Sequence, residues 1–593
     1  MLTPGAVLLH DNQNPQGQSL LFAEPREVLV AHDAATARAA LARLAEAGAQ
    51  GFWAAGYLAY ELGFLFEERL APLLPPRLKT PLLWFGLYDC PRPVGAADMA
   101  ALLAEAGHGA AANLYPSLDL PAYEAAFDQV KALIAAGDAY QVNLTMQARF
   151  TLEGDPLGLY ARLAASQPVA YGAYIDAGDH QVLSRSPELF VSGRGEALKA
   201  RPMKGTLKRG IHLADDEADR LALAGDAKNR AENLMIVDLL RNDLGRIAEI
   251  GSVRVTDLFT VETYRSLHTM TSGIEATRRK DIGMLEMLHN LFPCGSITGA
   301  PKVRAMEIIH AVEAGPRGLY TGSIGYIAPS GDFSFNVAIR TAIIDAAGNG
   351  SIGIGGGVVA DSTARAEYEE ALLKLKFLAD PAPPVTLIET FKWTPEAGYA
   401  LLGRHLDRLA ASAAYFALPM TKEGVADYLA NAARAWDAPM RVRLTLSATG
   451  LALSAVTLPP SPEIFRFAIA AERLDSTSLW LAHKTTNRDF YDQPRQRAHV
   501  ERGLDELVFC NERGELTEGS FTNLFIERNG ALLTPALSSG LLPGTLRAEL
   551  LDRGEAREAV LTLADLDAAE AIFLGNSLRG LIRAEWIRND EHA

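Results

Sequence analysis

Apolar residues recur with helical spacing in some segments of the chain and run together or alternate in others. The helical pattern covers residues 121–136, 213–243 and 364–378, and later residues 403–416. Strands are predicted at HQVLSRSPELFVSG, LYTGSIGYIAP and FSFNVAIRTAIID, and again from residue 385 to 393. Helices and strands do not alternate regularly, so the pattern predicts an α+β protein rather than a doubly wound parallel sheet.

The sharpest interruption of this pattern is LADPAPPVTLIET, at residues 378–390. Three prolines in four positions (Pro381, Pro383 and Pro384) cannot continue the preceding helix and favour extended backbone. We interpret residues 381–386 as a linker between a first domain, residues 1–380, and a second, residues 387–593. The alternative is a surface loop within a single domain.

Composition and charge narrow the class of protein. Of 593 residues, 49% are hydrophobic and 22% charged, which is typical of globular proteins and excludes collagen-like or disordered chains. The three scattered cysteines suit a reducing compartment, and the net charge of −16 argues against nucleic-acid binding. The chain lacks an apolar stretch of about 18 residues and a recognisable signal peptide. We therefore expect a cytoplasmic protein with no membrane partner.

Charged residues gather on one face of the predicted helix that starts near residue 364. Glu367, Glu370 and Lys374 are spaced i, i+3 and i+7, so the two carboxylates could hold a hard cation such as magnesium. The alternative is an ordinary solvated face. The glycine-rich segment GIGGGVVADS just upstream predicts a loop with accessible backbone N–H groups. Glu232, on another predicted helix, is a candidate for the same cation.

Two further candidate residues stand close to prolines. Lys204 lies in RPMKGT, where backbone breakers on both sides make it a candidate nucleophile or anion ligand. Glu188 follows Pro187 at the end of an apolar strand, where burial would raise its pKa and suit a general acid. Alone, each residue would more often be a surface lysine or a turn carboxylate.

Taken together, these segments resemble the chorismate-utilising enzymes, which include anthranilate, aminodeoxychorismate, isochorismate and salicylate synthases. The resemblance covers about residues 121–378 and rests on GDAYQVNLT, SRSPELF, RPMKGT, AENLMIVDLLRNDLGR, PCGSITGAPK, GLYTGSIGY, FNVAIRTA, GIGGGVVADS and AEYEEALLK. It implies an α/β sandwich of two antiparallel sheets and a magnesium ion held by Glu232 and Glu370, with Glu367 beside them. It also implies that the chorismate carboxylates are bound by Arg340, Lys374, Tyr320, Thr298, Gly356 and Gly357.

Two positions distinguish members of this family, and a third departs from its usual pattern. The resemblance places Gln141 where isochorismate and salicylate synthases carry a water-activating lysine. Lys204 stands where anthranilate synthases have alanine and aminodeoxychorismate synthases have lysine, which implies amination at C4 of chorismate. In that chemistry Lys204 would add to ring C2 while Glu188 protonates the departing hydroxyl. Thr269 occupies a slot where many relatives carry histidine, and His268 lies one residue earlier. No glutaminase domain is recognisable, so we expect ammonia from a separate glutamine amidotransferase subunit or from free ammonium.

The second part carries its own candidate site. Lys484 lies in LAHKTTNRDFYD, Glu518 in a turn between predicted strands, and Arg408 on the helix in GRHLDRLAASAAYF. The segments SSGLLPGTLR and FLGNSLRG offer loop-to-helix amides and a serine hydroxyl, which are common phosphate ligands.

This ordered set resembles the fold-type IV pyridoxal phosphate enzymes over nearly all of residues 385–593. The resemblance implies that Lys484 binds the cofactor covalently and that Glu518 faces the pyridine nitrogen. It assigns the phosphate to Arg408, Ser577, Thr545 and Leu546, although the usual G-I-T-R loop here reads GTLR. Relatives of this type are usually dimers, so we expect a homodimer through this part.

The two resemblances together predict a bifunctional enzyme that makes 4-aminobenzoate for folate. The first part would produce 4-amino-4-deoxychorismate, and the second would eliminate pyruvate from it. One alternative pairs anthranilate synthase chemistry with a fold-type IV aminotransferase. Another is a metabolite-binding regulator without catalysis.

Overall fold

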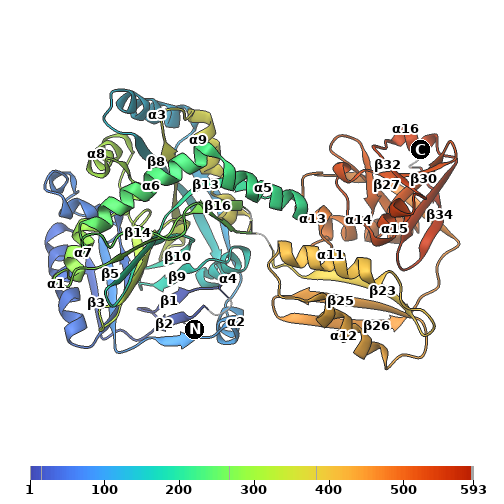
Figure 1. Ribbon diagram of the computed structural model, residues 1–593, viewed down its shortest axis with the longest axis horizontal. Helices are drawn as coiled ribbons and strands as arrows, with labels where there is room; N and C mark the ends of the chain where they lie inside the picture. Colours follow the sequence, from blue (N-terminus) through green and yellow to red (C-terminus); the bar gives the residue numbers. More distant parts are fainter. Residues whose placement is uncertain (1, 15–16, 266, 382, 589–593) are drawn as a thin grey trace. The chain divides into compact units, whose positions relative to one another are not determined.

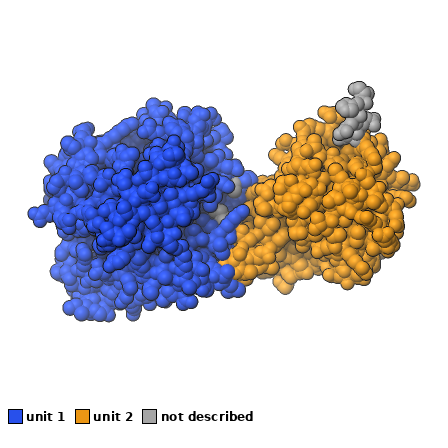
Figure 2. Space-filling model, turned by 90° about the horizontal axis from the view of Figure 1, so that it is seen from above, with its two compact units in different colours: residues 1–208, 220–383 blue, residues 209–219, 384–593 orange. Residues whose placement is uncertain are grey.

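The computed structural model describes residues 2–14, 17–265, 267–381 and 383–588. These residues form two compact units, residues 1–208 with 220–383 and residues 209–219 with 384–593 (Figure 2). Residue 382 of the predicted linker lies outside the described residues, and the predicted limits 1–380 and 387–593 stay predictions. None of the described helices is long and apolar enough to cross a membrane.

The first unit contains two large antiparallel sheets and a small one (Figure 1). The ten-stranded sheet has the order β18 (Gly299–Ala300), β8 (Gln141–Gly154), β22 (Asn349–Val358), β21 (Thr341–Asp345), β10 (His180–Ser186), β9 (Tyr171–Asp176), β1 (Val7–His10), β2 (Ser19–Phe22) and β6 (Arg92–Val94), with β7 (Gly109–Pro116) also on β8. The nine-stranded sheet has the order β14 (Arg254–Val255), β17 (Ile274–Thr277), β12 (Ala197–Arg201), β11 (Leu189–Arg194), β20 (Phe333–Asn336), β19 (Ser323–Ile327), β4 (Trp53–Leu58), β5 (Leu83–Tyr88) and β3 (Glu27–Ala31). The small sheet has the order β13 (Met203–Lys208), β16 (Leu267–Thr271) and β15 (Thr260–Thr263).

Successive side chains of one strand enter different cores. On β9, Ala173 and Ile175 belong to a core between the two large sheets, together with Tyr57 of β4. Tyr174, between them in sequence, belongs to a second core on the helix-covered side of the ten-stranded sheet. Both faces of the strand are therefore buried, which explains why it reads as an apolar run rather than as a polar–apolar alternation.

Helices cover the outer faces of the two large sheets. Side chains of α3, α8 and α9 pack with β8 and β22, and side chains of α1, α6 and α7 pack with the nine-stranded sheet. The helices of this part are α1 (Ala34–Ala49), α2 (Ala96–Ala104), α3 (Leu120–Ala135), α4 (Pro156–Ser166), α6 (Ala227–Gly245), α7 (Met284–Leu291), α8 (Lys302–Val312), α9 (Ala364–Leu373) and α10 (Lys376–Ala379). The helix α5 (Leu213–Gly225) begins in residues of the second unit and ends in residues of the first.

Two of the predicted elements differ from those observed. The helix expected over 213–243 is two helices, because Asp226 caps α6 by accepting a 2.7 Å hydrogen bond from the backbone N–H of Asn229. The glycine-rich segment expected to be a loop is the second half of β22, paired with β8 as far as Val358. Its pairing with β21 ends at Ile352, so the following glycines lie in a strand that is paired along one edge.

The second unit contains two sheets. The small one has the order β24 (Gly398–Tyr399), β23 (Leu387–Thr394), β25 (Met440–Ser447) and β26 (Gly450–Thr457). On β25, Val442 and Leu444 are buried against α11 and α12, while Arg441 and Arg443 point away from this core and are exposed. Period-two alternation therefore places both arginines on the other face of the sheet.

The larger sheet closes on itself. Its order is β29 (Leu516–Gly519), β28 (Glu506–Asn511), β27 (Ile464–Leu474), β34 (Gly580–Trp586), β33 (Ala571–Asn576), β30 (Asn523–Arg528), β31 (Ala531–Pro535) and β32 (Arg557–Ala559), and β29 also pairs with β30. The helices are α11 (Leu402–Tyr415), α12 (Lys422–Ala433), α13 (Leu479–Ala482), α14 (Asp489–Arg502), α15 (Thr545–Asp552) and α16 (Leu563–Asp567). The predicted α+β class, with two large antiparallel sheets in the first part, is confirmed.

Candidate active sites

A cavity of about 460 Å³ lies in the first unit, where the chain crosses between its two large sheets. Glu188 lies on the crossing from β10 to β11, and Arg340 on the crossing from β20 to β21. Other lining residues come from β13, β16, β22, α6 and α9. Residues far apart in sequence therefore meet at one place because the two sheets share these crossings.

The glycines of β22 make room for charged side chains. A Cβ atom at Gly356 would come within 2.7 Å of Glu367 Oε2, and one at Gly357 within 2.6 Å of Lys204 Nζ. Any larger residue at these positions would force the ends of these two charged side chains to shift. The glycines therefore serve close approach, as the sequence predicted, but from a strand rather than a loop.

Four carboxylates and three lysines line this cavity, and two of the lysines lie close to glutamates. Lys374 Nζ lies 2.9 Å from Glu370 Oε1 and donates a 2.7 Å hydrogen bond to the carbonyl of Gly355, while Lys204 Nζ lies 3.9 Å from Glu232 Oε2. Burial raises the pKa of Glu367. Burial also opposes ionisation of Glu370, but Lys374 outweighs it and brings the pKa of this carboxyl below its ordinary value.

Lys204 is aimed into the cavity by an irregularity of β13. The pairing of β13 with β16 shifts register between Met203 and Thr206, and Gly205 has a φ of 88°. Thr269 Oγ1 donates a 3.1 Å hydrogen bond to the carbonyl of Gly205, which fixes the bulge from the neighbouring strand. Burial lowers the pKa of Lys204, with Glu232 opposing this effect, so the neutral amine is more accessible than on an ordinary lysine.

Glu188 is buried on the same cavity. Ser296 Oγ donates a 2.7 Å hydrogen bond to Glu188 Oε1. Burial raises the pKa of Glu188 to about 7, although this hydrogen bond, the backbone N–H of Met203 and Lys204 all favour the carboxylate. A carboxyl group with this pKa is protonated in a substantial fraction of molecules near neutral pH and suits a general acid.

Arg340 is held in an unusual conformation at the cavity wall. Its φ is 50°, in the left-handed region that residues other than glycine rarely adopt, and its Nη1 atom is buried without a hydrogen-bond partner among the described residues. An unpaired buried guanidinium nitrogen is costly unless an acceptor binds there. The geometry therefore fits recognition of an anionic group.

The second unit contains a separate cavity of about 650 Å³. Lys484 projects into it from the segment between α13 and α14, and its backbone carbonyl accepts a 2.8 Å hydrogen bond from the N–H of Ile388. Burial lowers the pKa of Lys484 to about 7, with Arg488 and Arg408 acting in the same direction. The amine of Lys484 is thus neutral in about half of the molecules near pH 7.

Glu518 is almost fully buried on the same cavity. Its Oε1 atom accepts hydrogen bonds from the Tyr491 hydroxyl (2.8 Å) and the Leu542 backbone N–H (2.9 Å), and its Oε2 atom accepts one from Asn523 Nδ2 (3.1 Å). Burial raises the pKa of Glu518 to about 7 against these hydrogen bonds. The carboxyl group is therefore fixed in position and ready to pair with a cationic partner.

A third cluster combines Arg408, His405 and the start of α15. Arg408 Nε and Nη2 donate to the two oxygens of Glu389 at 2.9 and 2.6 Å, and His405 Nδ1 lies 2.6 Å from Glu389 Oε2. Burial opposes ionisation of Glu389, but Arg408 and His405 lower its pKa to about 2. His405 Nε2 lies 2.9 Å from Ser577 Oγ, so a buried ion pair orients this hydroxyl beside the start of α15.

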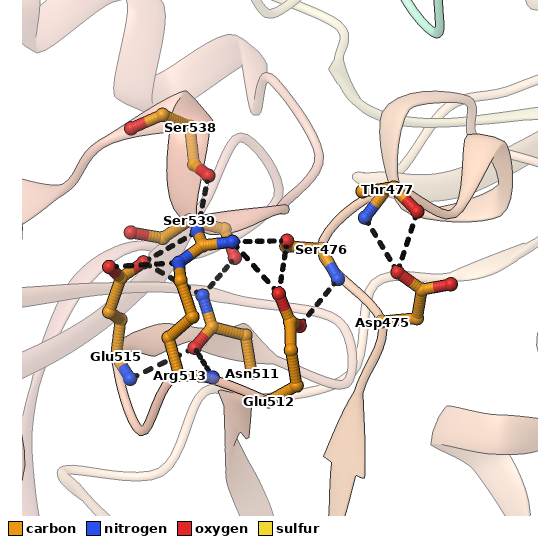
Figure 3. Close-up of polar contacts among 9 residues, drawn as sticks. All are labelled: Asp475, Ser476, Thr477, Asn511, Glu512, Arg513, Glu515, Ser538 and Ser539. Carbon is orange, nitrogen blue, oxygen red and sulfur yellow. Dashed lines mark hydrogen bonds and ion pairs between the residues drawn. The ribbon is translucent and has the colours of Figure 1, made fainter.

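A polar network holds the loop that leads to α15 (Figure 3). Arg513 donates to the carbonyl of Ser538 (2.8 Å), to Ser476 Oγ (2.6 Å) and to the carboxylates of Glu512 and Glu515. Through these contacts the turn after β28 is joined to the turn after β27 and to residues 537–539. The network thereby positions Leu542, whose N–H reaches Glu518, and the N-terminus of α15.

Comparison with known proteins decides the family. A family model described as chorismate binding enzyme matches residues 5–380, more than half of the chain. The chain belongs to the chorismate-binding enzyme family. A second model, described as amino-transferase class IV, matches residues 386–587. Both resemblances predicted from the sequence motifs are confirmed at this level.

Individual relatives of this chorismate-binding enzyme match mainly its first part. Aminodeoxychorismate synthase component 1 of Bacillus subtilis is 41% identical over 252 residues, which cover 42% of this chain and 53% of the relative. Chloroplastic aminodeoxychorismate synthase of Arabidopsis thaliana is 46% identical over 247 residues, 41% of this chain and 27% of the relative. The crystal structure of anthranilate synthase component I from Streptococcus pneumoniae aligns with a TM-score of 0.51 at 26% identity, over 64% of this chain and 90% of that one. The chain thus spans 27% to 53% of these two curated relatives.

The residues of the first cavity fit a magnesium ion. Glu232, Glu367 and Glu370 supply hard oxygen ligands on one cavity, although the described residues contain no preformed cluster of three or more metal-binding side chains. Magnesium commonly uses one or two protein carboxylates and completes its shell with water and substrate oxygens. Glu232 and Glu370 could hold the ion in this way, with Glu367 nearby.

The residues of the second cavity fit pyridoxal phosphate. Lys484 and Glu518 offer an amine and a carboxyl group for the two ends of the pyridine ring, and both line one cavity. Gly544 is the N-cap of α15 without a side-chain cap, so the amides of Thr545 and Leu546 are available to an anion. The Ser577 hydroxyl adds a further donor, whereas Arg408 directs two of its nitrogens to Glu389.

Most predicted site residues lie on the two cavities, with some exceptions. Thr298 does not line the first cavity, and its hydroxyl donates to the carbonyls of Cys294 and Gly295. Thr269 lines it, whereas His268 does not and contacts the Thr263 hydroxyl instead. Gln141 is completely buried beside Lys204, since a Cβ at Gly357 would lie 3.0 Å from Gln141 Nε2.

Sequence reasoning missed two residues that orient others. Ser296 lies within the recognised PCGSITGAPK motif, but nothing in the motif links it to Glu188. His405 stands three residues before Arg408, and this helical spacing could have placed both on the face that meets Glu389. The roles assigned to individual site residues stay predictions.

Proposed function

We propose that this chain converts chorismate to 4-aminobenzoate and pyruvate in two reactions, one in each unit. The first is chorismate plus ammonia to 4-amino-4-deoxychorismate plus water, and the second splits that product. The observation that carries the proposal is Lys204, a partly buried lysine that lines the cavity from a bulge and shares it with Glu188 and the glutamate cluster. The curated relatives from Arabidopsis thaliana and Bacillus subtilis bear the name aminodeoxychorismate synthase, which supports this chemistry for the first unit.

In the first reaction Lys204 acts as nucleophile and Glu188 as acid. The neutral Lys204 amine forms a bond to ring C2, the ring double bond shifts, and the C4–oxygen bond breaks. Glu188 gives its proton to the departing hydroxyl, which leaves as water. Ammonia then bonds to C4 and the electrons return to expel Lys204. Magnesium at Glu232 and Glu370 supplies charge neutralisation for the ring carboxylate, and Arg340 supports binding of a substrate anion.

In the second reaction Lys484 moves protons. Pyridoxal phosphate, when bound, supplies an electron sink for the substrate nitrogen. Lys484, with a pKa of about 7, removes the proton from ring C4 and later delivers one to the methylene carbon of the departing enolpyruvyl group. Glu518 would pair with the pyridine nitrogen of the bound cofactor. The aromatic ring of 4-aminobenzoate forms as the C3–oxygen bond breaks.

Product identification tests both reactions at once. The purified chain is supplied with chorismate, magnesium, ammonium and pyridoxal phosphate, and products are separated by chromatography. We expect 4-aminobenzoate and pyruvate in equal amounts. Formation of ortho-aminobenzoate would overturn the proposed first reaction, and accumulation of 4-amino-4-deoxychorismate would overturn the second.

We also propose that ammonia comes from a separate glutamine amidotransferase. The name component 1 of the Bacillus subtilis relative supports a multi-subunit enzyme. Glutamine should not replace ammonium with the purified chain alone, and should replace it once an amidotransferase subunit is added. Glutamine-dependent product from the chain alone would contradict this.

A further inference from the structure

The second cavity is strongly basic beyond what the cofactor site uses. Five arginines line it in addition to Arg408, whereas its acidic lining residues are Asp492 and Glu518; the five are Arg441, Arg443, Arg488, Arg495 and Arg579. Arg488 is neutralised locally, because its Nε lies 3.0 Å from both oxygens of Asp492. No described carboxylate lies within salt-bridge distance of the other four arginines, so their positive charges are not neutralised by an ion pair.

Arg495 and Arg579 form a pair around one aromatic ring. The guanidinium carbon of Arg495 lies 5.4 Å from the centre of the Phe521 ring, and that of Arg579 lies 5.8 Å from the same centre. Arg579 also lies 5.9 Å from the ring of Phe465. Contact with aromatic rings holds the two long side chains in place without neutralising them.

Both arginines have unused hydrogen-bonding capacity. The Nε atoms of Arg495 and Arg579 are buried and have no hydrogen-bond partner among the described residues. Burial and the nearby positive charge of Arg441 lower the pKa of Arg579, and Glu506 and Asp505 oppose this in part. Two cations held against one ring, each with a buried unpaired donor, are unfavourable unless an anion binds to them.

The position of the pair points to substrate rather than to the cofactor phosphate. Donors for the phosphate are already grouped at Ser577 and the start of α15. Arg495, Phe521 and Arg579 also line an adjoining cavity of about 380 Å³. The pair therefore lies where the cofactor cavity continues into further space.

We propose that Arg495 and Arg579, held against Phe521, bind a carboxylate of the amine substrate, which makes the second site selective for amines with two carboxylates. The proposal rests on the proposed function, because 4-amino-4-deoxychorismate carries a ring carboxylate and an enolpyruvyl carboxylate. Arg441, on the adjacent sheet face, supplies a third positive charge. Paired guanidinium groups suit the two oxygens of a carboxylate.

Steady-state kinetics of the holoenzyme variants Arg495→Met, Arg579→Met and the double variant test this. We expect the KM for 4-amino-4-deoxychorismate to rise about ten- to hundredfold in the double variant, the range expected when a charged hydrogen bond is lost. The kcat should stay within about threefold and the cofactor dissociation constant should not change. Arg497→Met is the matched control, since Arg497 is on the same helix but is exposed and pairs with Glu472.

A second arm separates failure of this proposal from failure of the proposed function. The absorption change of the bound cofactor is followed with glutamate, which has two carboxylates, and with alanine, which has one. One outcome is that the wild type fails to process 4-amino-4-deoxychorismate while the arginine variants lose the response to glutamate and keep the response to alanine. That result would overturn the proposed function and support the dicarboxylate site. A double variant that matches Arg497→Met with every amine tested, or that loses cofactor affinity in parallel, overturns the site.

Discussion

Lys204 and Lys484 are both partly buried lysines with lowered pKa values, but their surroundings carry opposite charge. Lys204 lies among Glu232, Glu367 and Glu370, which favour its ammonium form and partly offset burial. Lys484 lies beside Arg488 and Arg408, which add to the effect of burial. Both lysines are therefore more easily neutral than an ordinary lysine. In the first unit the nearby negative charges oppose this, and in the second unit the nearby positive charges favour it.

This difference indicates what each site has yet to bind. Clustered carboxylates are stable only when a cation joins them, and clustered guanidinium groups only when an anion does. The first site is thus suited to a divalent cation that in turn receives a carboxylate. The second is suited directly to phosphate and carboxylate groups. The net charge of −16 does not prevent this, because acidic residues cluster at the first site and basic residues cluster at the second.

Exchanging each lysine for alanine should give the largest effects. We expect Lys204→Ala to reduce formation of 4-amino-4-deoxychorismate, and Lys484→Ala to reduce its breakdown, each by about a thousandfold or more. Each variant should keep the other reaction within about twofold of the wild type. Separate assays of the two reactions measure this, with the exposed Lys422→Ala as control. A variant that loses both reactions equally would show that the two sites are not independent.

Removing one negative charge from the first site should weaken its cation binding. In Glu370→Gln we expect the magnesium concentration for half-maximal amination to rise about tenfold or more, because a charged oxygen ligand is lost. Magnesium titration of the first reaction measures this. Glu369→Gln is the matched control, because Glu369 is the next residue of α9 and pairs with Arg365 on the surface. An unchanged magnesium requirement in Glu370→Gln would rule out Glu370 as a ligand.

The two sites should also respond to pH in opposite directions between pH 6 and pH 8. Glu188, with a pKa of about 7, is protonated below that pH and loses its function as an acid above it. Lys484, also with a pKa of about 7, is mostly cationic at pH 6 and mostly neutral at pH 8. The neutral fraction rises about tenfold over this range, so covalent incorporation of pyridoxal phosphate into apoenzyme should accelerate by about that factor.

The opposite pH dependence, which is expected from Glu188, is measured as the rate of the first reaction. With free ammonia held at the same concentration at each pH, its rate should fall from pH 7 to pH 8 in the wild type. Glu188→Gln should be slow at both pH values and should not show this fall. Incorporation of the cofactor that does not depend on pH would contradict the pKa assigned to Lys484. An amination rate that keeps rising above pH 7 would contradict the acid role of Glu188.

The sequence predicted the chemistry of these sites better than their construction. Lys204, Glu188 and Lys484 could be found because each stands in a short recognisable motif, with a glycine beside Lys204 and a proline beside Glu188. Their orienting partners could not be found in this way. Ser296 reaches Glu188 across more than a hundred residues, and such contacts depend on sheet topology, which local patterns do not specify.

The segment 209–219 shows the same limit for domain assignment. Its position in sequence assigned it to the first part, but it packs with the second unit. Arg209 pairs with Asp216 at 2.5 Å, its guanidinium carbon lies 3.7 Å from the centre of the Tyr415 ring, and the carbonyl of Ile211 lies 3.0 Å from His483 Nε2. The proline-rich linker marks one place where the chain passes from the first unit to the second. It does not indicate that residues 209–219, earlier in the chain, also belong to the second unit.

The smallest expected effect concerns Arg513, which supports the second site from a distance. Its contacts join three turns and thereby place the loop before α15 (Figure 3). Exposed ion pairs contribute about 0 to 1 kcal/mol each, so Arg513→Ala should weaken cofactor binding only about two- to fivefold. Equilibrium titration of apoenzyme with pyridoxal phosphate measures this, with Arg497→Ala as the control that removes an exposed ion pair elsewhere. Because Arg513 belongs to the second unit, the amination rate should not change. A loss of amination, or a cofactor affinity equal to that of the control, would show that this network does not serve the phosphate end of the site.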